Sequence, residues 1–137
     1  MVKNIVKDIE FLKIKSSPFL KEDIFIVDDL KDTLRFNRKY CVGMAANMIG
    51  YSKNCIIFID EKESMQIMIE PKIIKKEGEY KTMEGCLSLI GKRECIRYKK
   101  IKVEYLTEKI EKRIKTFTDF TAEIIQHEID HLSGIII

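Results

Sequence analysis

The sequence predicts an α+β fold, a single domain spanning residues 1–137 in which antiparallel strands pack around a C-terminal helix. The length of 137 residues suits one hydrophobic core. A hydrophobic content of 45% argues against a disordered chain. Apolar residues recur at helical spacing near both ends, whereas a two-residue alternation typical of strands occupies the middle.

The first predicted helix covers roughly residues 22–39. Its apolar residues recur at four-residue steps and therefore share one face: Ile26, Leu30 and Leu34. Residues 43–50 are expected to form a loop that enters the next strand.

The middle of the chain is predicted to form strands. Cys55 to Ile59 is a continuous apolar run, typical of a buried strand. Residues 66–80 are expected to form one or two strands, with Pro71 at an edge or a break. Residues 96–105 alternate clearly, and residues 110–117 alternate loosely and are expected to pair back as a hairpin.

A last helix is expected after Thr118 or Asp119, either of which could cap it. Its inner stripe is expected to consist of four apolar side chains: Ala122, Ile125, Ile129 and Leu132. The two histidines of this segment, His127 and His131, lie on the flank that faces the sheet.

The chain's only two histidines stand four residues apart, in His127-Glu128-Ile129-Asp130-His131. Positions i and i+4 of a helix lie one above the other, so both imidazoles can reach one metal ion. Glu128 stands beside them as a candidate general base. A solvated helix end that carries two histidines by coincidence is the weaker explanation, because the chain has no other histidine. Asp130 is expected to be a solvated or supporting helix residue.

A hydrolytic metal ion usually has three protein ligands and one open position. No histidine remains, so the third ligand is expected to be a cysteine or a carboxylate. Four cysteines are present, and none forms a C-x-x-C pair: Cys41, Cys55, Cys86 and Cys95. Cys55 and Cys95 are expected to be small buried hydrophobes. Cys86 follows Gly85, which permits unusual backbone angles, and it is the best candidate by elimination.

Two motifs resemble the second and third signature motifs of the peptide deformylases. They are Glu84-Gly85-Cys86-Leu87-Ser88 and the segment Gln126 to Leu132 that contains the two histidines. The family's first motif, G-x-G-x-A-A-x-Q, has a partial counterpart at residues 41–48. The similarity runs from about residue 24 to the end of the given sequence.

The resemblance implies a ligand set and a reaction. The implied metal ligands are Cys86, His127 and His131, and Glu128 is the implied general acid/base. The implied reaction is hydrolytic removal of the formyl group from the N-terminal formylmethionine of newly made polypeptides, so the partners are N-formylmethionyl peptides. Ferrous iron (Fe2+) is the family's common metal, with zinc (Zn2+) or nickel (Ni2+) as substitutes. A thiolate ligand suits these metals and argues against magnesium or calcium.

Further roles follow from the resemblance alone. The main-chain N–H of Leu87 is expected to help hold the oxyanion, and Gly43 to lie near the substrate. Met44 either lines a pocket for a methionine side chain or belongs to the core. Two arginines follow the second motif: Arg93 is expected near the substrate, and Arg97 is expected to pair with Glu84 and brace the loop.

Two departures from the first motif fall on functional positions. Met48 stands where the family has a glutamine that donates a hydrogen bond to the oxyanion, and Cys41 replaces the first glycine. A thioether has no N–H, and loss of one such donor lowers the rate by about 10²–10³-fold. The alternative to a slowed enzyme is a metal- and formyl-peptide-binding paralogue with little turnover. A structural zinc site is disfavoured because it usually has four protein ligands.

Charge and composition restrict the other partners. The net charge of +3 is small beside 25 basic and 22 acidic residues, so the lysines are expected to solvate surfaces rather than bind a specific nucleic acid. A weak alternative is transient contact with the ribosome. No apolar run approaches the roughly 20 residues of a membrane span. Charged residues interrupt the N-terminal apolar positions, so no signal peptide is expected, and unpaired cysteines favour the cytoplasm.

Overall fold

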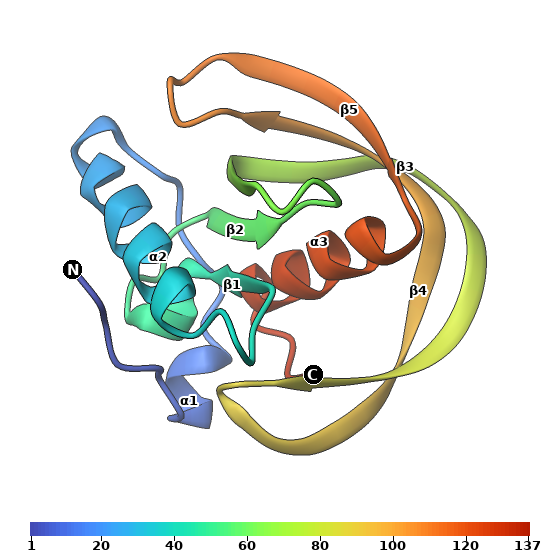
Figure 1. Cartoon of the computed structure of the whole chain (residues 1–137), viewed down its shortest axis with the longest axis horizontal. Helices are drawn as coiled ribbons and strands as arrows, with labels where there is room; N and C mark the ends of the chain where they lie inside the picture. The colour runs from blue at the N-terminus through green and yellow to red at the C-terminus, as the bar shows by residue number, and fades with distance from the viewer.

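The computed structural model describes residues 1–137 and contains one five-stranded antiparallel sheet in the order β1-β2-β3-β4-β5. The long strands β3 and β4 curve around the C-terminal helix α3, and helix α2 lies on the other side of β1 and β2 (Figure 1). The elements are α1 Ile9–Leu12, the 3-10 turn η1 Lys21–Ile24, α2 Phe25–Phe36, β1 Gly43–Ala45, the 3-10 turn η2 Ala46–Ile49, β2 Cys55–Ile59, β3 Met65–Cys86, β4 Leu89–Leu106, β5 Lys112–Thr118 and α3 Asp119–Leu132.

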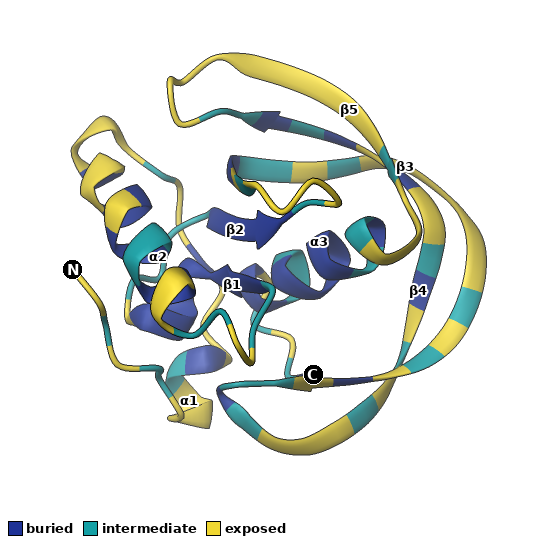
Figure 2. Ribbon diagram, in the orientation of Figure 1, coloured by how far each residue is buried: buried dark blue, intermediate teal, exposed yellow.

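Strand β2 is buried on both faces (Figure 2). Successive side chains of a strand point to opposite faces, so Ile57 packs in the cluster that contains α2, and Ile56 and Phe58 pack in the cluster that contains α3. The α2 stripe of Ile26, Leu30 and Leu34 fills the first cluster, and Ala122 and Ile125 of α3 belong to the second. The continuous apolar run of β2 is therefore explained by helices on both sides.

The hairpin of β3 and β4 brings a distant part of the chain to α3. Its pairing runs from Ile69 opposite Leu106 to Cys86 opposite Leu89, with shifts of register between Ile69 and Lys72 and between Ile73 and Lys75. Such bulges bend a strand and increase its twist. The curved hairpin thus returns Cys86 to the side of α3 that carries the histidines.

The expected α+β class is confirmed, as are the strand at Cys55–Ile59 and the hairpin that contains β5. The helix expected at 22–39 is present as η1 and α2. The last helix begins at Asp119 after Thr118 as N-cap, but the Thr118 side chain makes no capping hydrogen bond.

Two expectations about local structure were wrong. Residues 43–50 contain β1 and η2 rather than a loop alone, and Cys95 is half-buried rather than part of the core. The short helix α1 had no counterpart among the expected elements. Pro71 lies at an edge as expected, because β3 pairs with β2 only as far as Ile69 and its register with β4 shifts between Ile69 and Lys72, which accommodates a residue without an N–H donor. Ile129 is half-buried and packs against the same cluster as the rest of its stripe. None of the helices has the length and apolar character required to span a membrane.

Candidate metal centre and catalytic pocket

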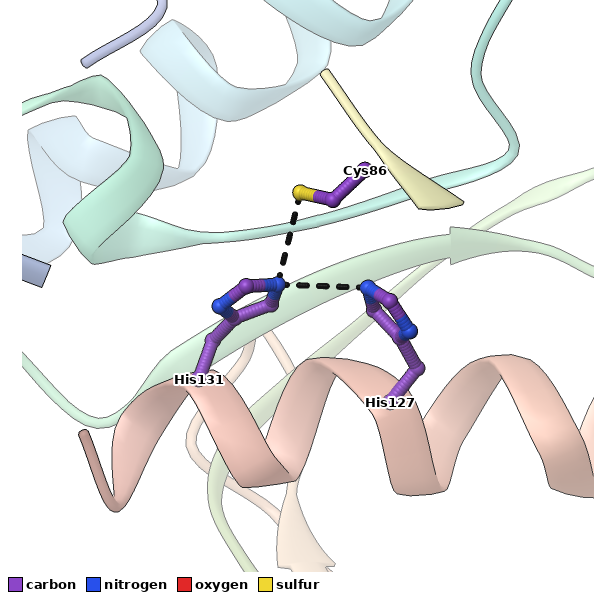
Figure 3. A group of neighbouring side chains, drawn as sticks. All are labelled: Cys86, His127 and His131. Carbon is purple, nitrogen blue, oxygen red and sulfur yellow. Dashed lines mark hydrogen bonds between the residues drawn. The ribbon is translucent and has the colours of Figure 1, made fainter. Parts of the chain in front are cut away.

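Helix α3 and the end of β3 bring three potential metal ligands together. The Nε2 atoms of His127 and His131, one turn apart on α3, lie 3.2 Å from each other. Cys86 Sγ lies 3.4 Å from His131 Nε2. All three ligand atoms are within 4.8 Å of one another and converge on one point between the strand end and the helix (Figure 3).

These spacings fit a tetrahedral metal site. Zinc bonds of about 2.0–2.1 Å to nitrogen and about 2.3 Å to sulfur place tetrahedral ligands about 3.4 Å apart for two nitrogens and about 3.6 Å apart for nitrogen and sulfur. The observed separations of 3.2 Å and 3.4 Å differ from these by about 0.2 Å. Two imidazoles and a thiolate also suit zinc or ferrous iron chemically. The residues therefore fit a divalent transition metal, and only three of its positions would be taken by protein.

A buried ion-pair network fixes the ring of His127. Its Nδ1 lies 2.7 Å from Glu84 Oε1. Arg97 donates to both Glu84 oxygens, from Nη2 at 2.8 Å and from Nε at 3.0 Å, and its Nη1 donates to Asp130 at 2.7 Å. The expected pair of Arg97 and Glu84 is thus present, and Asp130 accepts from the same arginine. A carboxylate that accepts from Nδ1–H leaves Nε2 free to bind a metal.

The same contacts keep Glu84 and Arg97 charged. Burial alone would raise the pKa of Glu84, but hydrogen bonds from His127 and Arg97 hold that pKa well below its usual range. Burial likewise opposes the charge on Arg97, yet its bonds to Glu84 and Asp130 raise its pKa. Glu84 therefore remains an acceptor for the His127 ring.

The pKa values of the two histidines move in opposite directions. Burial lowers the pKa of His127, but hydrogen bonds to Cys86 and Glu84 outweigh it and raise that pKa to about 10. Burial, followed by the charge of His127, lowers the pKa of His131 to about 3. Two facing nitrogens 3.2 Å apart do not both accept a proton readily. At most one of the two rings is therefore protonated near neutral pH.

Glu128 faces a cavity of about 550 Å³. Its side chain is 4% exposed, and its Oε1 has no hydrogen-bond partner. Burial raises the pKa of this carboxyl to about 7, in the range that suits a general acid/base near neutral pH. The cavity is lined by Tyr40, Cys41, Val42, Gly43, Met48, Met83, Glu84, Gly85, Cys86, Leu87, Gly91, Lys92, Phe120, Glu123, Ile124, His127 and Glu128.

Gly43 allows β1 to lie directly against α3. A methyl group at this position would be 2.9 Å from Ile124 Cγ2, 3.0 Å from Glu128 Oε2 and 3.2 Å from the main-chain oxygen of Ile57. A main-chain oxygen within a sheet cannot move aside easily. The glycine is therefore explained by close approach to α3, at Ile124 and Glu128, and to the neighbouring strand β2.

Residues 41–48 supply no strong side-chain donor to the cavity. Met48 is buried, and its Sδ accepts from the main-chain N–H of Ala45 at 3.5 Å. Cys41 donates its S–H to the oxygen of Gly43 at 2.9 Å, and burial raises the pKa of this thiol to about 12. Both hydrogen bonds are made within residues 41–48 rather than to a substrate in the cavity.

The remaining predicted residues occupy different environments. Leu87 lies in the two-residue turn between β3 and β4 and lines the cavity. Met44 is fully buried among core residues and does not line the cavity, so its interpretation as core is favoured. Arg93 is half-buried opposite Glu84 in the hairpin and is not part of the cavity lining either.

Sequence reasoning missed two residues near the centre. Glu123 lines the cavity four residues before His127, and helical spacing was a sufficient signal for it. Asn47 donates to the main chain of His131, and no local pattern indicates that contact.

Fold and site together define a class of protein. An antiparallel sheet curves around a helix that supplies two histidines and an adjacent glutamate, and a cysteine is the third potential ligand. This is the arrangement of a small metal-dependent hydrolase.

Comparison with known proteins identifies the family. The family model described as Polypeptide deformylase matches residues 2–137. A peptide deformylase of Clostridium beijerinckii is 52% identical over 137 residues, which covers all of both chains. Peptide deformylase 2 of Clostridium acetobutylicum is 39% identical over 133 residues, covering 93% of this chain and 86% of that protein. The chain belongs to the peptide deformylase family.

Solved structures agree with this assignment. A ligand-bound class I type b peptide deformylase from Acinetobacter baumannii superposes with a TM-score of 0.89 at 29% identity, covering 99% of this chain and 97% of that one. A Met-Ala-Ser-bound structure of class I type b peptide deformylase from the same organism gives a TM-score of 0.88 at 28% identity, with the same coverage. The resemblance inferred from the motifs is thereby confirmed.

Proposed function

We propose that this protein removes the N-formyl group from the N-terminal formylmethionine of newly made polypeptides by metal-dependent hydrolysis. The observation that carries the proposal is the convergence of Cys86, His127 and His131 beside the buried carboxylate of Glu128. Family membership supports the reaction class, and the Met-Ala-Ser complex of the Acinetobacter enzyme supports a peptide that begins with methionine.

Cys86, His127 and His131 would hold the ion, and Fe2+ is the proposed native metal, with Zn2+ or Ni2+ as substitutes. When bound, such an ion polarises a carbonyl group and lowers the pKa of water to about 7. Glu84 and Arg97 hold the His127 ring in the orientation that the site requires.

Glu128 is proposed as the group that moves the proton. It would accept a proton from the attacking water and deliver it to the leaving amine. Its raised pKa of about 7 suits both directions of transfer. The close approach at Gly43 places the main chain of β1 beside this carboxylate, where the substrate would lie.

Leu87 is proposed to donate its main-chain N–H to the oxyanion. Met48 lines the same cavity but has no donor to add, so we propose an active enzyme with reduced turnover. The alternative is a paralogue that binds metal and formyl-peptide with little turnover. Met48 and the Cys41 thiol, which is already bound to Gly43, favour that alternative.

The decisive experiment measures hydrolysis of a formyl-Met peptide by anaerobically purified protein loaded with Fe2+, Ni2+ or Zn2+. Turnover that depends on the added ion is expected. Tight binding of metal and peptide without turnover would overturn the enzyme proposal in favour of the paralogue. Action on new polypeptides also leads us to propose a cytoplasmic location and transient contact with the ribosome.

A further inference from the structure

Asn47 is buried beside the metal centre and has no part in the hydrolysis proposed above. It lies in η2, and none of its surface is exposed. Its Nδ2 donates a 2.9 Å hydrogen bond to the main-chain oxygen of His131, which is 84 residues away in the sequence. This bond connects the wall formed by β1 and η2 to a ligand-bearing residue of α3.

The position of His131 in its helix makes such a bond useful. Helix α3 ends at Leu132, so His131 lies in the last turn, where carbonyl groups lack partners within the helix. Its oxygen accepts one bond from the N–H of Gly134 just beyond the helix, at 3.0 Å, and the second from Asn47. Asn47 therefore adds a side-chain bond to a helix end whose last carbonyls also accept from Ser133, Gly134 and Ile135 and, at Leu132, from the N–H of Ser16.

The two histidines are held in different ways. The ring of His127 is fixed by Glu84, which is itself bound to Arg97. The ring of His131 contacts only the other two ligand residues through Nε2, and its buried Nδ1 has no partner. Packing and the hydrogen bonds of its main chain therefore position His131, in place of a hydrogen bond at Nδ1.

A second observation concerns the same pair of residues. Asn47 Oδ1 and His131 Nδ1 are both buried without a hydrogen-bond partner. An imidazole that binds a metal through Nε2 carries a proton on Nδ1, which it donates to a nearby oxygen or water. The structure shows no bond between these two atoms, so the ring of His131 lacks a partner at Nδ1 of the kind that Glu84 provides for His127.

We infer that Asn47 is a positioning residue for the metal site, holding the last turn of α3 so that His131 Nε2 meets Cys86 and His127. This inference rests on the proposed metal-dependent function. Loss of such supporting contacts typically lowers metal affinity by about 10–100-fold. Asn47→Ala is therefore expected to bind Zn2+ about 10–100-fold more weakly than the parent protein.

The test is Zn2+ affinity by competition with a chromophoric chelator, measured together with thermal unfolding. Asn37→Ala is the matched control, because Asn37 Nδ2 also donates to a main-chain oxygen, that of Thr33, at 2.8 Å near the end of α2. Both variants lose a helix-end bond, but only Asn47→Ala is expected to lose Zn2+ affinity. Asn47→Leu keeps the side-chain volume without the donor and is expected to show the same loss.

The visible absorption spectrum of the Co2+-loaded proteins provides a separate readout of ligand geometry. It is expected to change in both Asn47 variants and to stay unchanged in Asn37→Ala. Parent-like Zn2+ affinity in Asn47→Leu or in a folded Asn47→Ala would overturn the positioning role while leaving the proposed hydrolysis intact. A parent protein that fails to bind Zn2+, Ni2+ or Fe2+ would instead overturn the metal site itself, and this inference with it.

Discussion

The two walls of the catalytic cavity differ in how their polar groups are used. The wall made by α3 and the β3–β4 hairpin contains a connected set of buried charges, in which Arg97 bridges Glu84 and Asp130 and Glu84 holds His127. The wall made by residues 41–48 is mainly apolar, and its side-chain hydrogen bonds close its own turn or reach the main chain of His131.

Metal-dependent hydrolysis requires metal ligands with a proton-transferring group, and it also requires donors to the oxyanion. The two walls differ in which of these groups they contain. The first wall contains the three candidate ligands, of which His127 is fixed by Glu84 on β3, together with the buried carboxylate of Glu128. The second wall supplies shape, through Gly43, but no side-chain donor at the place where negative charge develops. Variants in each wall are therefore expected to fail in different ways.

The largest effect is expected at the ligands of the first wall. Cys86→Ala should abolish stoichiometric metal binding, because two imidazoles alone cannot hold the ion tightly. Elemental analysis of the purified variant measures this. Cys95→Ala is the matched control, since Cys95 is also half-buried but lies outside the ligand cluster. A full metal complement in Cys86→Ala would show that the third ligand is another residue.

The next effect separates proton transfer from metal binding within the same wall. Glu128→Gln should retain the metal and lose about 10²–10⁴-fold in kcat, because an amide cannot accept the water's proton. Steady-state hydrolysis of a formyl-Met peptide, with the metal content measured on the same sample, tests this. A parent-like rate in Glu128→Gln would exclude this residue as the base.

The third variant tests whether the buried charges of the first wall depend on one another. Arg97→Leu removes two of the hydrogen bonds to the buried carboxylate of Glu84 and leaves it with His127 alone, and breaking a buried pair typically costs about 3–5 kcal/mol. Urea unfolding should show a free energy of unfolding lower by that amount. Arg113→Leu removes an exposed pair with Glu111 and should cost less than about 1 kcal/mol. Equal losses in the two variants would mean that the network adds no particular stability.

The sequence predicts contacts between residues that are close together in the chain, and misses contacts between residues far apart in it. The histidine pair and Glu128 could be predicted because helix geometry alone fixes residues four apart. Cys86 was reached by elimination among the cysteines, and the pair formed by Arg97 and Glu84 was expected from the resemblance to the family. Asn47 could not be predicted, because its bond to His131 depends on how η2 packs against the end of a helix 84 residues away.

The local errors have equally specific causes. β1 is three residues long and buried throughout, so it shows no alternation that would predict a strand. Pro71 is not among these errors: β3 loses its pairing with β2 after Ile69 and shifts register with β4 there, so the expected edge and break are both present within a strand that continues. Cys95 lies in β4 with its Sγ near the oxygen of Thr82 at 3.7 Å rather than in the core, and sequence alone does not show which face of that strand is covered.

The smallest expected effect is that of Met48→Gln, which tests the lack of a side-chain donor in the wall made by residues 41–48. Met48→Gln would add an amide to the apolar wall without a large change of side-chain length. The main-chain N–H of Ala45, which now reaches Met48 Sδ at 3.5 Å, could donate to Gln Oε1 and thereby orient the new Nε2–H group. A donor of this kind acts mainly in the transition state, so the gain should appear in kcat with little change in KM. We expect about a tenfold gain, less than the roughly 10²–10³-fold cost of deleting an oxyanion donor, because Cys41 still occupies the Gly43 carbonyl.

Met48→Leu is the matched control, since it changes the side chain without adding a donor and should show no gain. A parent enzyme that is already fast, together with no gain in Met48→Gln, would mean that the first wall and Leu87 stabilise the oxyanion without help from the second.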